Sequence, residues 1–159
     1  MNTLDTEFTQ IIKENKSTIY TVCYMFSNDP EEVNDLFQET LINMWKGFSS
    51  FRKQSHISTW IWRISLNTCI SAERKRRSRE FHSLSMDINL FEDRGEDNKQ
   101  IQMLHHRISR LKPFDRAIVL LWLENLSYEE IASIIGISVK NVSVRLFRIK
   151  EELKKMSND

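Results

Sequence analysis

The sequence predicts an all-α fold, with two small helical domains joined by a flexible linker. Its 159 residues include only three glycines and two prolines, which are too few for the many turns of an all-β fold. Apolar residues recur at spacings of three and four over most of the chain, as they do along one face of a helix. Residues 81–100 hold five acidic and two basic side chains, between parts that are mildly basic. We therefore predict domains at residues 1–80 and 101–159, with the linker at residues 81–100.

The first two helices of the first domain are predicted from their apolar spacing and from one strong start signal. The first helix is expected over residues 4–27. The second begins sharply, because Asp29 can cap it, Pro30 suits its first position and acidic residues fill its first turn. Its apolar stripe consists of Val33, Leu36, Phe37, Leu41, Met44 and Trp45.

The third helix is predicted over residues 59–79, after a polar stretch at residues 49–58. It is amphipathic at first and then basic, with five positive charges in the six residues 74–79. Basic residues interleaved with aromatic ones suit single-stranded nucleic acid, whose bases stack on rings and whose phosphates pair with cations. Trp60 either walls a pocket for a base or packs in the core, and the pattern leaves both open. The donors that we expect to face nucleic acid are Arg63, Asn67, Arg74, Arg76 and Arg77.

Four helices are predicted in the second domain, and their ends are well marked. Pro113 suits the first position of a helix. Ser127 and Glu130 have the spacing of a capping box, and Ser138 can cap the last helix. The expected helices cover residues 101–111, 113–125, 128–135 and 139–154.

Residues 127–149 show the spacing of a helix-turn-helix. Ala132 lies four residues before Gly136 and lets two helices cross closely, while Val142 packs the second helix on the first. The second helix of such a motif usually enters the major groove of DNA. The alternative is an ordinary helical hairpin with a solvated charged face, which gives no reason for an exposed Phe147. The face that we expect to meet DNA consists of Lys140, Val144, Phe147 and Arg148, flanked by Asn141 and Arg145.

The second helix of the first domain is acidic along its length. Carboxylates in its first turn compensate the helix dipole, but the dipole does not explain Asp35 and Glu39 farther along. An acidic surface repels nucleic acid and attracts a basic protein surface. We therefore expect this helix to bind a protein.

Several functions are disfavoured by what the sequence lacks. It has no phosphate-binding loop, zinc-protease, hydrolase or paired-cysteine motif, so we expect neither an enzyme nor a bound metal or cofactor. The longest apolar run has seven residues, against roughly 20 for a membrane span. The N-terminus carries acids and no apolar signal segment. Cys23 and Cys69 lie in apolar helical patterns, and we expect buried thiols in a cytoplasmic protein.

These signals occur in the order found in bacterial RNA polymerase sigma factors. The segment Asp35-Leu-Phe-Gln-Glu39 resembles the polymerase-docking motif of that family, and residues 51–79 resemble its promoter-melting loop and helix. Residues 111–116 and 126–132 resemble the opening of its fourth region, and residues 141–148 resemble its recognition helix. The chain resembles the extracytoplasmic-function (ECF) group of the sigma-70 family, which keeps only the second and fourth conserved regions.

The resemblance implies a function, partners and further site residues. It implies an alternative sigma factor that binds core RNA polymerase and promoter DNA, opens that DNA and is masked by an anti-sigma factor. We expect a monomer when the protein is free, without insertion into a membrane. The implied polymerase-binding residues are Asp35, Leu36, Gln38 and Glu39. The implied melting residues are Phe51, Arg52, Lys53, Gln54, Ser55, His56 and Trp60, together with the five donors of the third helix. Besides the recognition-helix residues, the implied upstream-element contacts are Arg116, Ser127, Tyr128, Ser138 and Ser143.

The main alternative is a helix-turn-helix transcriptional regulator without polymerase-melting function. Such a regulator would bind a palindromic site as a homodimer and would have no use for the acidic helix. The melting-type segment at residues 51–79 argues against it.

Overall fold

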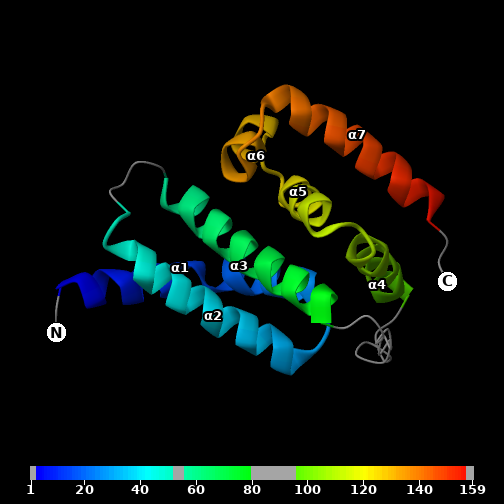
Figure 1. Ribbon diagram of the computed structural model, residues 1–159. Helices are drawn as coiled ribbons and strands as arrows, with labels where there is room; N and C mark the ends of the chain where they lie inside the picture. The colour runs from blue at the N-terminus through cyan, green and yellow to red at the C-terminus, as the bar shows by residue number, and fades with distance from the viewer. Residues whose placement is uncertain (1–2, 52–55, 80–95, 157–159) are drawn as a thin grey trace. The chain divides into compact units, whose positions relative to one another are not determined.

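The computed structural model describes residues 3–51, 56–79 and 96–156, and within these ranges helices are the only regular secondary structure (Figure 1). The chain forms two units, Met1–Ala72 and Glu73–Asp159. The prediction of an all-α fold with two small helical domains is therefore confirmed. The division between the units falls within the third helix, eight residues before the predicted boundary after residue 80.

The first unit is built from α1 (Thr3–Phe26), α2 (Pro30–Phe48) and the first part of α3 (Ile57–Arg79). The start of α2 is as predicted, because the backbone of Asp29 is extended and its carboxylate accepts a hydrogen bond from the Glu31 N–H at 3.0 Å. The third helix begins two residues before its predicted start.

Apolar side chains of α1 and α2 form most of the core of the first unit. Tyr20 stacks on Phe37 with ring centroids 4.0 Å apart, and Phe8 meets Trp45 edge to face at 5.1 Å. Trp45 remains 45% exposed, so it lies at the rim of the core rather than inside the predicted stripe. The fully or nearly fully buried members of the two helices are Ile19, Val22, Cys23, Phe26, Val33, Leu36 and Met44.

Both cysteines are free and buried, as predicted. A hydrogen bond with the Cys69 side chain lowers the pKa of the Cys23 thiol, and burial opposes this effect by raising it. A further hydrogen bond with Thr40 also lowers that pKa. The two thiols and the Thr40 hydroxyl thus form a small polar cluster among the apolar side chains of the core.

The second unit contains four more helices, which were all predicted from the sequence. They are α4 (Glu96–Ser109), α5 (Pro113–Leu123), α6 (Tyr128–Ile135) and α7 (Val139–Lys155). The fourth helix starts five residues early, so the end of the predicted linker is helical. Residues 80–95 lie outside the described residues. The core between α5, α6 and α7 holds side chains that are at most 1% exposed, namely Ile118, Leu121, Ile131, Val142, Leu146 and Ile149.

Local hydrogen bonds set the ends of α6 and α7. The predicted capping box is present, since Ser127 Oγ accepts from the Glu130 N–H at 3.1 Å and the Glu130 carboxylate accepts from the Ser127 N–H at 3.3 Å. Ser138 Oγ accepts from the Asn141 N–H at 3.1 Å, which caps α7. Gly136 ends α6 in the left-handed conformation with φ of 86°, as the predicted tight turn requires.

Candidate functional site

The helices α6 and α7 form the predicted helix-turn-helix (Figure 1). Ala132 is 8% exposed and Val142 is fully buried, so the small residue and the packing residue both lie inside, where the spacing predicts them. The turn between the helices is closed by two backbone hydrogen bonds, because the N–H groups of Gly136 and Ile137 donate to the Ala132 carbonyl at 2.8 and 3.2 Å. These contacts give the second helix a defined direction relative to the first.

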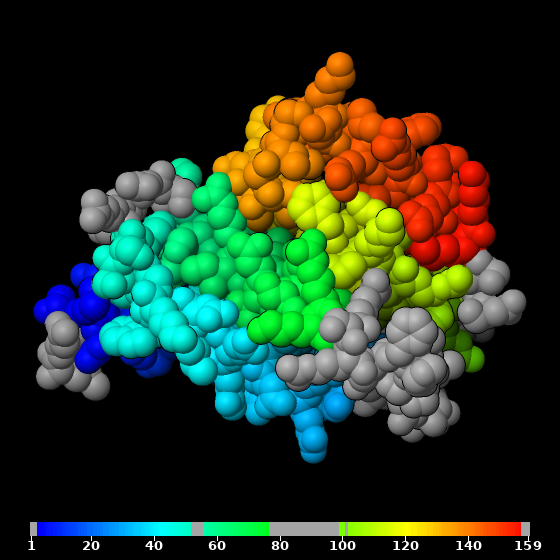
Figure 2. Space-filling view, in the orientation of Figure 1, coloured from blue at the N-terminus to red at the C-terminus, as the bar shows by residue number. Residues whose placement is uncertain are grey.

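The outer face of α7 presents cations and apolar groups together. Val144 is 40% exposed and Phe147 is 68% exposed, the largest exposed fraction among the large apolar side chains described. Lys140 and Arg148 flank them, and in the described part of the chain neither has an ion-pair partner. Figure 2 shows the side chains of α7, in orange to red, along the surface of the second unit. The exposed residues of this face are Lys140, Asn141, Ser143, Val144, Phe147 and Arg148.

Other predicted DNA contacts have structural partners of their own. The hydroxyl groups of Ser127 and Ser138 cap α6 and α7, and Tyr128 is half-buried in the first turn of α6. Arg145 forms an ion pair of 3.5 Å with Asp115 and is 45% exposed.

The prediction for Arg116 needs correction. Its side chain is 2% exposed, and its Nη2 donates to the carbonyls of Ser109 at 2.6 Å and Leu111 at 3.1 Å. In this conformation Arg116 stabilises the turn between α4 and α5 instead of facing DNA, because orphan carbonyls at the end of α4 need donors.

The acidic face of α2 is exposed as predicted, with one exception. Asp35, Gln38 and Glu39 are exposed on one side of the helix. Leu36 is 5% exposed and belongs to the core, so it supports α2 from the inside and is not available to a partner. The hundred-degree turn per residue separates Leu36 from its exposed neighbours.

Two exposed apolar residues extend the same face of α2, and neither was predicted from the sequence as part of it. Ile42 is 53% exposed and Trp45 is 45% exposed. Ile42 follows Gln38 by four residues and Glu39 by three, so a helical projection could have placed it on this face. Trp45 could not be found this way, since its apolar character and spacing equally suit the core. The candidate docking face of α2 therefore consists of Asp35, Gln38, Glu39, Ile42 and Trp45.

The start of α3 is anchored by aromatic packing. Trp60 is half-buried and packs against Phe48 and Phe51, with ring centroids at 6.1 and 4.9 Å, so it has the packing role that the sequence allowed. His56 is exposed just before the helix. The loop residues Arg52, Lys53, Gln54 and Ser55 lie outside the described residues.

The predicted donors of α3 differ in their exposure. Asn67 and Arg74 are exposed, whereas Arg63 is half-buried. Arg76 is bound by the Glu73 carboxylate at 2.5 Å, one turn earlier on the same helix. Arg77 lies within α3, but its side chain is outside the described part.

Within the described ranges, no group of three or more histidine, cysteine or acidic side chains could hold a metal ion. None of the described helices is long and apolar enough to cross a membrane. What these residues offer is a cationic and apolar helix face in the second unit, and an acidic and apolar helix face in the first.

Both units match known protein families. Residues 11–79 match the family model of sigma-70 region 2, and residues 101–153 match that of sigma-70 region 4. RNA polymerase sigma factor YlaC of Bacillus subtilis is 32% identical over 79% of this chain and 77% of that protein. The ECF RNA polymerase sigma-E factor of Haemophilus influenzae is 30% identical over 89% of this chain and 81% of that protein.

The fold itself matches a solved sigma factor. The structure of RpoE from Bartonella quintana in complex with the anti-sigma factor NepR has a TM-score of 0.74 and 22% identity, and the match covers 94% of this chain and 95% of that one. This likeness supports the helical architecture, and the sequence matches support the family. Because both conserved regions occur in order and the relatives match over most of their length, the chain belongs to the extracytoplasmic-function group of the sigma-70 family of RNA polymerase sigma factors.

Proposed function

We propose that this sigma factor binds core RNA polymerase through the docking face of α2, opens promoter DNA with residues 51–79 and reads the upstream promoter element with α7. The exposure of Phe147 is the observation that carries the last assignment. Its ring is 68% exposed between cations on a helix whose opposite side is closed by the core. A ring in that position can contact a thymine methyl group in the major groove, while Lys140 and Arg148 reach base edges or phosphates.

The docking face of α2 suits a basic protein surface that also offers an apolar contact. Asp35 and Glu39 supply charge, which steers a basic partner and fixes its register. Ile42 and Trp45 supply apolar area next to those charges, and such area carries much of the energy of a protein interface. The two kinds of residue lie along one side of a single rigid helix.

Promoter opening is assigned to the loop before α3. Trp60 packs against Phe48 and Phe51, and this packing supports the start of α3 next to the loop. The polar residues 52–56 can hydrogen-bond the edge of an unpaired base, and exposed donors of α3 such as Asn67 and Arg74 can hold the adjacent strand. Unstacking and unpairing a base costs a few kcal/mol, which this capture has to offset.

An anti-sigma factor is the expected regulatory partner. RpoE from Bartonella quintana has been solved in complex with the anti-sigma factor NepR. We infer that this chain is masked in the same general way, that it is a monomer in the cytoplasm when free, and that it catalyses no reaction of its own. The polymerase supplies the chemistry of RNA synthesis.

Transcription from two forms of one promoter tests the proposal. Residues 52–56 are replaced by a Gly/Ser segment, and the full chain is assembled with core RNA polymerase. We expect this variant to bind core normally and to lose open-complex formation on duplex DNA. A template that is already unpaired at the start region should restore part of the transcription, because the cost of unpairing has been removed.

Permanganate reactivity of promoter thymines gives the direct measurement of opening. Normal reactivity of duplex thymines with the loop variant would exclude residues 52–56 as the capture site. If the wild-type chain bound a palindromic site as a homodimer and did not bind core polymerase, the regulator without melting function would be the better assignment.

A further inference from the structure

The side chain of Arg145 on α7 is held on two sides by the first turn of α5. Its Nη1 lies 3.5 Å from Oδ1 of Asp115, and its guanidinium carbon lies 4.8 Å from the centroid of the Phe114 ring. The side chains of Arg145 and Asp115 are 45% and 22% exposed, so the contact lies at the edge of the domain. Asp115, which lies 30 positions before Arg145 in the chain, thus fixes the direction in which the Arg145 side chain points from the recognition helix.

Two other cations of α7 are not fixed in this way. Lys140 and Arg148 are exposed and have no ion-pair partner among the described residues. Each of these side chains can therefore move to contact a phosphate wherever α7 happens to lie on the DNA. Arg145 differs from them because its position is set before DNA arrives.

The geometry leaves Arg145 able to bind DNA. A guanidinium group carries five N–H donors, and Asp115 engages only one of its nitrogens. The Phe114 ring lies against the guanidinium and limits its rotation. A side chain that is ordered in advance loses less entropy when it binds, so a phosphate at the right place is bound more tightly than by a mobile arginine.

The carboxylate of Asp115 has a second effect, which opposes binding. It neutralises part of the charge of Arg145 and repels any phosphate that approaches at random. Non-specific binding is built from phosphate contacts of this kind, so a tethered arginine adds little to it. In the specific complex the groove position of α7 is fixed, and one phosphate can lie where the tethered guanidinium points.

We propose that Asp115, together with Phe114, is a positioning and specificity-determining element, which directs Arg145 to one DNA phosphate in the correctly docked complex and limits its use elsewhere. This inference rests on the proposed function of α7 as the reader of the upstream element. It goes beyond that function by assigning a role in DNA discrimination to α5, which presents no recognition residue of its own.

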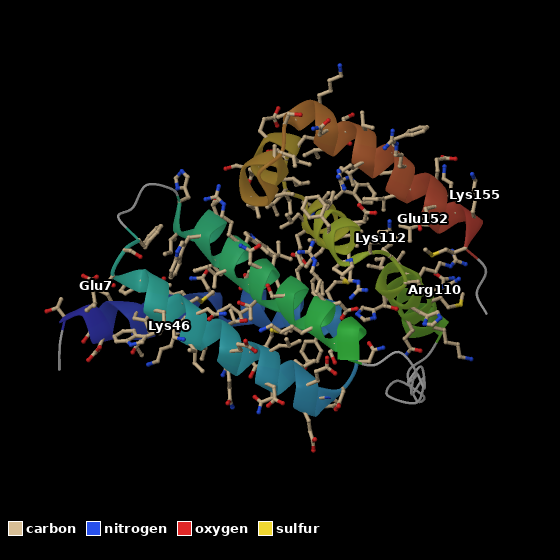
Figure 3. The ribbon with its side chains drawn as sticks, in the orientation of Figure 1. Glu7, Lys46, Arg110, Lys112, Glu152 and Lys155 are labelled. Atoms are coloured by element: carbon tan, nitrogen blue, oxygen red, sulfur yellow. The ribbon has the colours of Figure 1, made fainter. Side chains whose placement is uncertain are left out.

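Binding of the full chain in complex with core RNA polymerase tests this proposal. The probes are a promoter duplex whose upstream element the wild-type complex has selected from random-sequence DNA, and the same duplex with that element scrambled. Dissociation constants are measured at several salt concentrations for wild type, Asp115→Asn, Arg145→Ala and the double variant. Glu152→Gln is the matched control, because it removes one exposed carboxylate of α7 that has no ion-pair partner in the described ranges (Figure 3).

We expect Asp115→Asn to bind the scrambled duplex about two- to fivefold more tightly, the range typical of a partly exposed ion pair. Its salt dependence there should be steeper by up to about 0.9 in the logarithmic slope, the value for one more neutralised phosphate. Affinity for the selected duplex should change less, since the lost preorganisation offsets the freed charge. The ratio of specific to non-specific affinity should therefore fall, while Asp115→Glu and Glu152→Gln keep it.

The double variant separates positioning from a structural role. Asp115 also lies in the first turn of α5, where a carboxylate stabilises the helix dipole. If Asp115→Asn lowered the ratio equally in the Arg145→Ala background, the effect would not run through Arg145 and the proposal would be wrong. An unchanged ratio and slope for Asp115→Asn would overturn it too. If the wild-type complex selected no upstream sequence, the proposed function of α7 would fail, and the inference with it.

Discussion

Asn43 on α2 donates a hydrogen bond from Nδ2 to Oγ1 of Thr68 on α3, at 2.9 Å. The same hydroxyl donates to the Ile64 carbonyl one turn back, at 2.7 Å, and Thr68 is 6% exposed. One buried hydroxyl group therefore links the docking helix to the helix assigned to promoter opening. One of the two bonds of this hydroxyl is made to α2 and the other within α3. The Asn43–Thr68 contact therefore fixes how far α2 and α3 are shifted along one another.

Loss of this hydroxyl should destabilise the first unit. Thr68→Val keeps the shape of the side chain but leaves the Asn43 amide without its acceptor, at a cost of about 1–3 kcal/mol in the free energy of unfolding. Urea unfolding followed by tryptophan fluorescence measures this change. Thr9→Val is the matched control, because Thr9 makes the same type of bond to the Asp5 carbonyl on an exposed surface and should change stability by less than about 0.5 kcal/mol. Equal losses in the two variants would show that the bond between the helices contributes nothing.

Substitutions on the docking face should affect polymerase binding without affecting the fold of the first unit. We expect Asp35→Ala with Gln38→Ala to weaken binding to core RNA polymerase while helical content by circular dichroism stays unchanged. Gln10→Ala with Glu14→Ala is the control, since it removes one amide and one carboxylate from an exposed face of α1. Tight core binding by the Asp35/Gln38 double variant would contradict the assignment.

Substitution of Leu36, unlike that of its exposed neighbours, should lower stability and should not affect polymerase binding directly. It is 5% exposed, so Leu36→Ala creates a cavity and should lower the free energy of unfolding by about 2–5 kcal/mol. Any loss of polymerase binding should then follow the loss of folded protein in thermal melts. If Leu36→Ala kept full stability but lost binding to core RNA polymerase, Leu36 would have to contact the polymerase directly.

Substitution of the exposed residues of α7 should change the preferred upstream element. Lys140→Ala or Val144→Ala should alter the sequence selected from a random pool, at about 1–3 kcal/mol for each good base contact. Lys150→Ala is the control, because the Lys150 ammonium lies 4.2 Å from the centroid of the Trp122 ring and serves the packing of α7 on α5. If changes at 140, 141, 144 and 148 all left the selected sequence unaltered, α7 would not be the reader.

The turn of the helix-turn-helix should tolerate little change at Gly136. A Cβ atom there would meet nothing within 4 Å, so the cost of Gly136→Ala comes from its φ of 86° and should be about 1–2 kcal/mol. Asn125 has φ of 65°, and Asn125→Gly should change stability by less than about 0.5 kcal/mol, because glycine adopts this conformation without strain. Thermal melts of the full chain compare the two variants. An unaltered melting temperature for Gly136→Ala would disprove the strain.

Short-range interactions explain why so much of the fold could be predicted. The cap at Asp29, the capping box of Ser127 and Glu130 and the left-handed Gly136 depend on groups within a few residues of one another. Apolar spacing repeats every turn in the same way. These features are written into consecutive residues, so the helices, the two domains and the outward face of α7 follow from sequence.

Which side of each helix is buried and which is exposed depends on neighbouring helices that are distant in sequence. Leu36 and Trp45 both suit the apolar stripe of α2, yet packing against α1 buries the first and leaves the second at the rim. The contacts of Trp60 with two other rings, Phe48 and Phe51, also join residues that no periodic pattern pairs. The bond between Asp115 and Arg145 joins residues 30 apart, and no periodic pattern carries such a contact. Local hydrogen bonding and periodicity thus specify the elements, whereas the choice between core, rim and partner requires the packed helices.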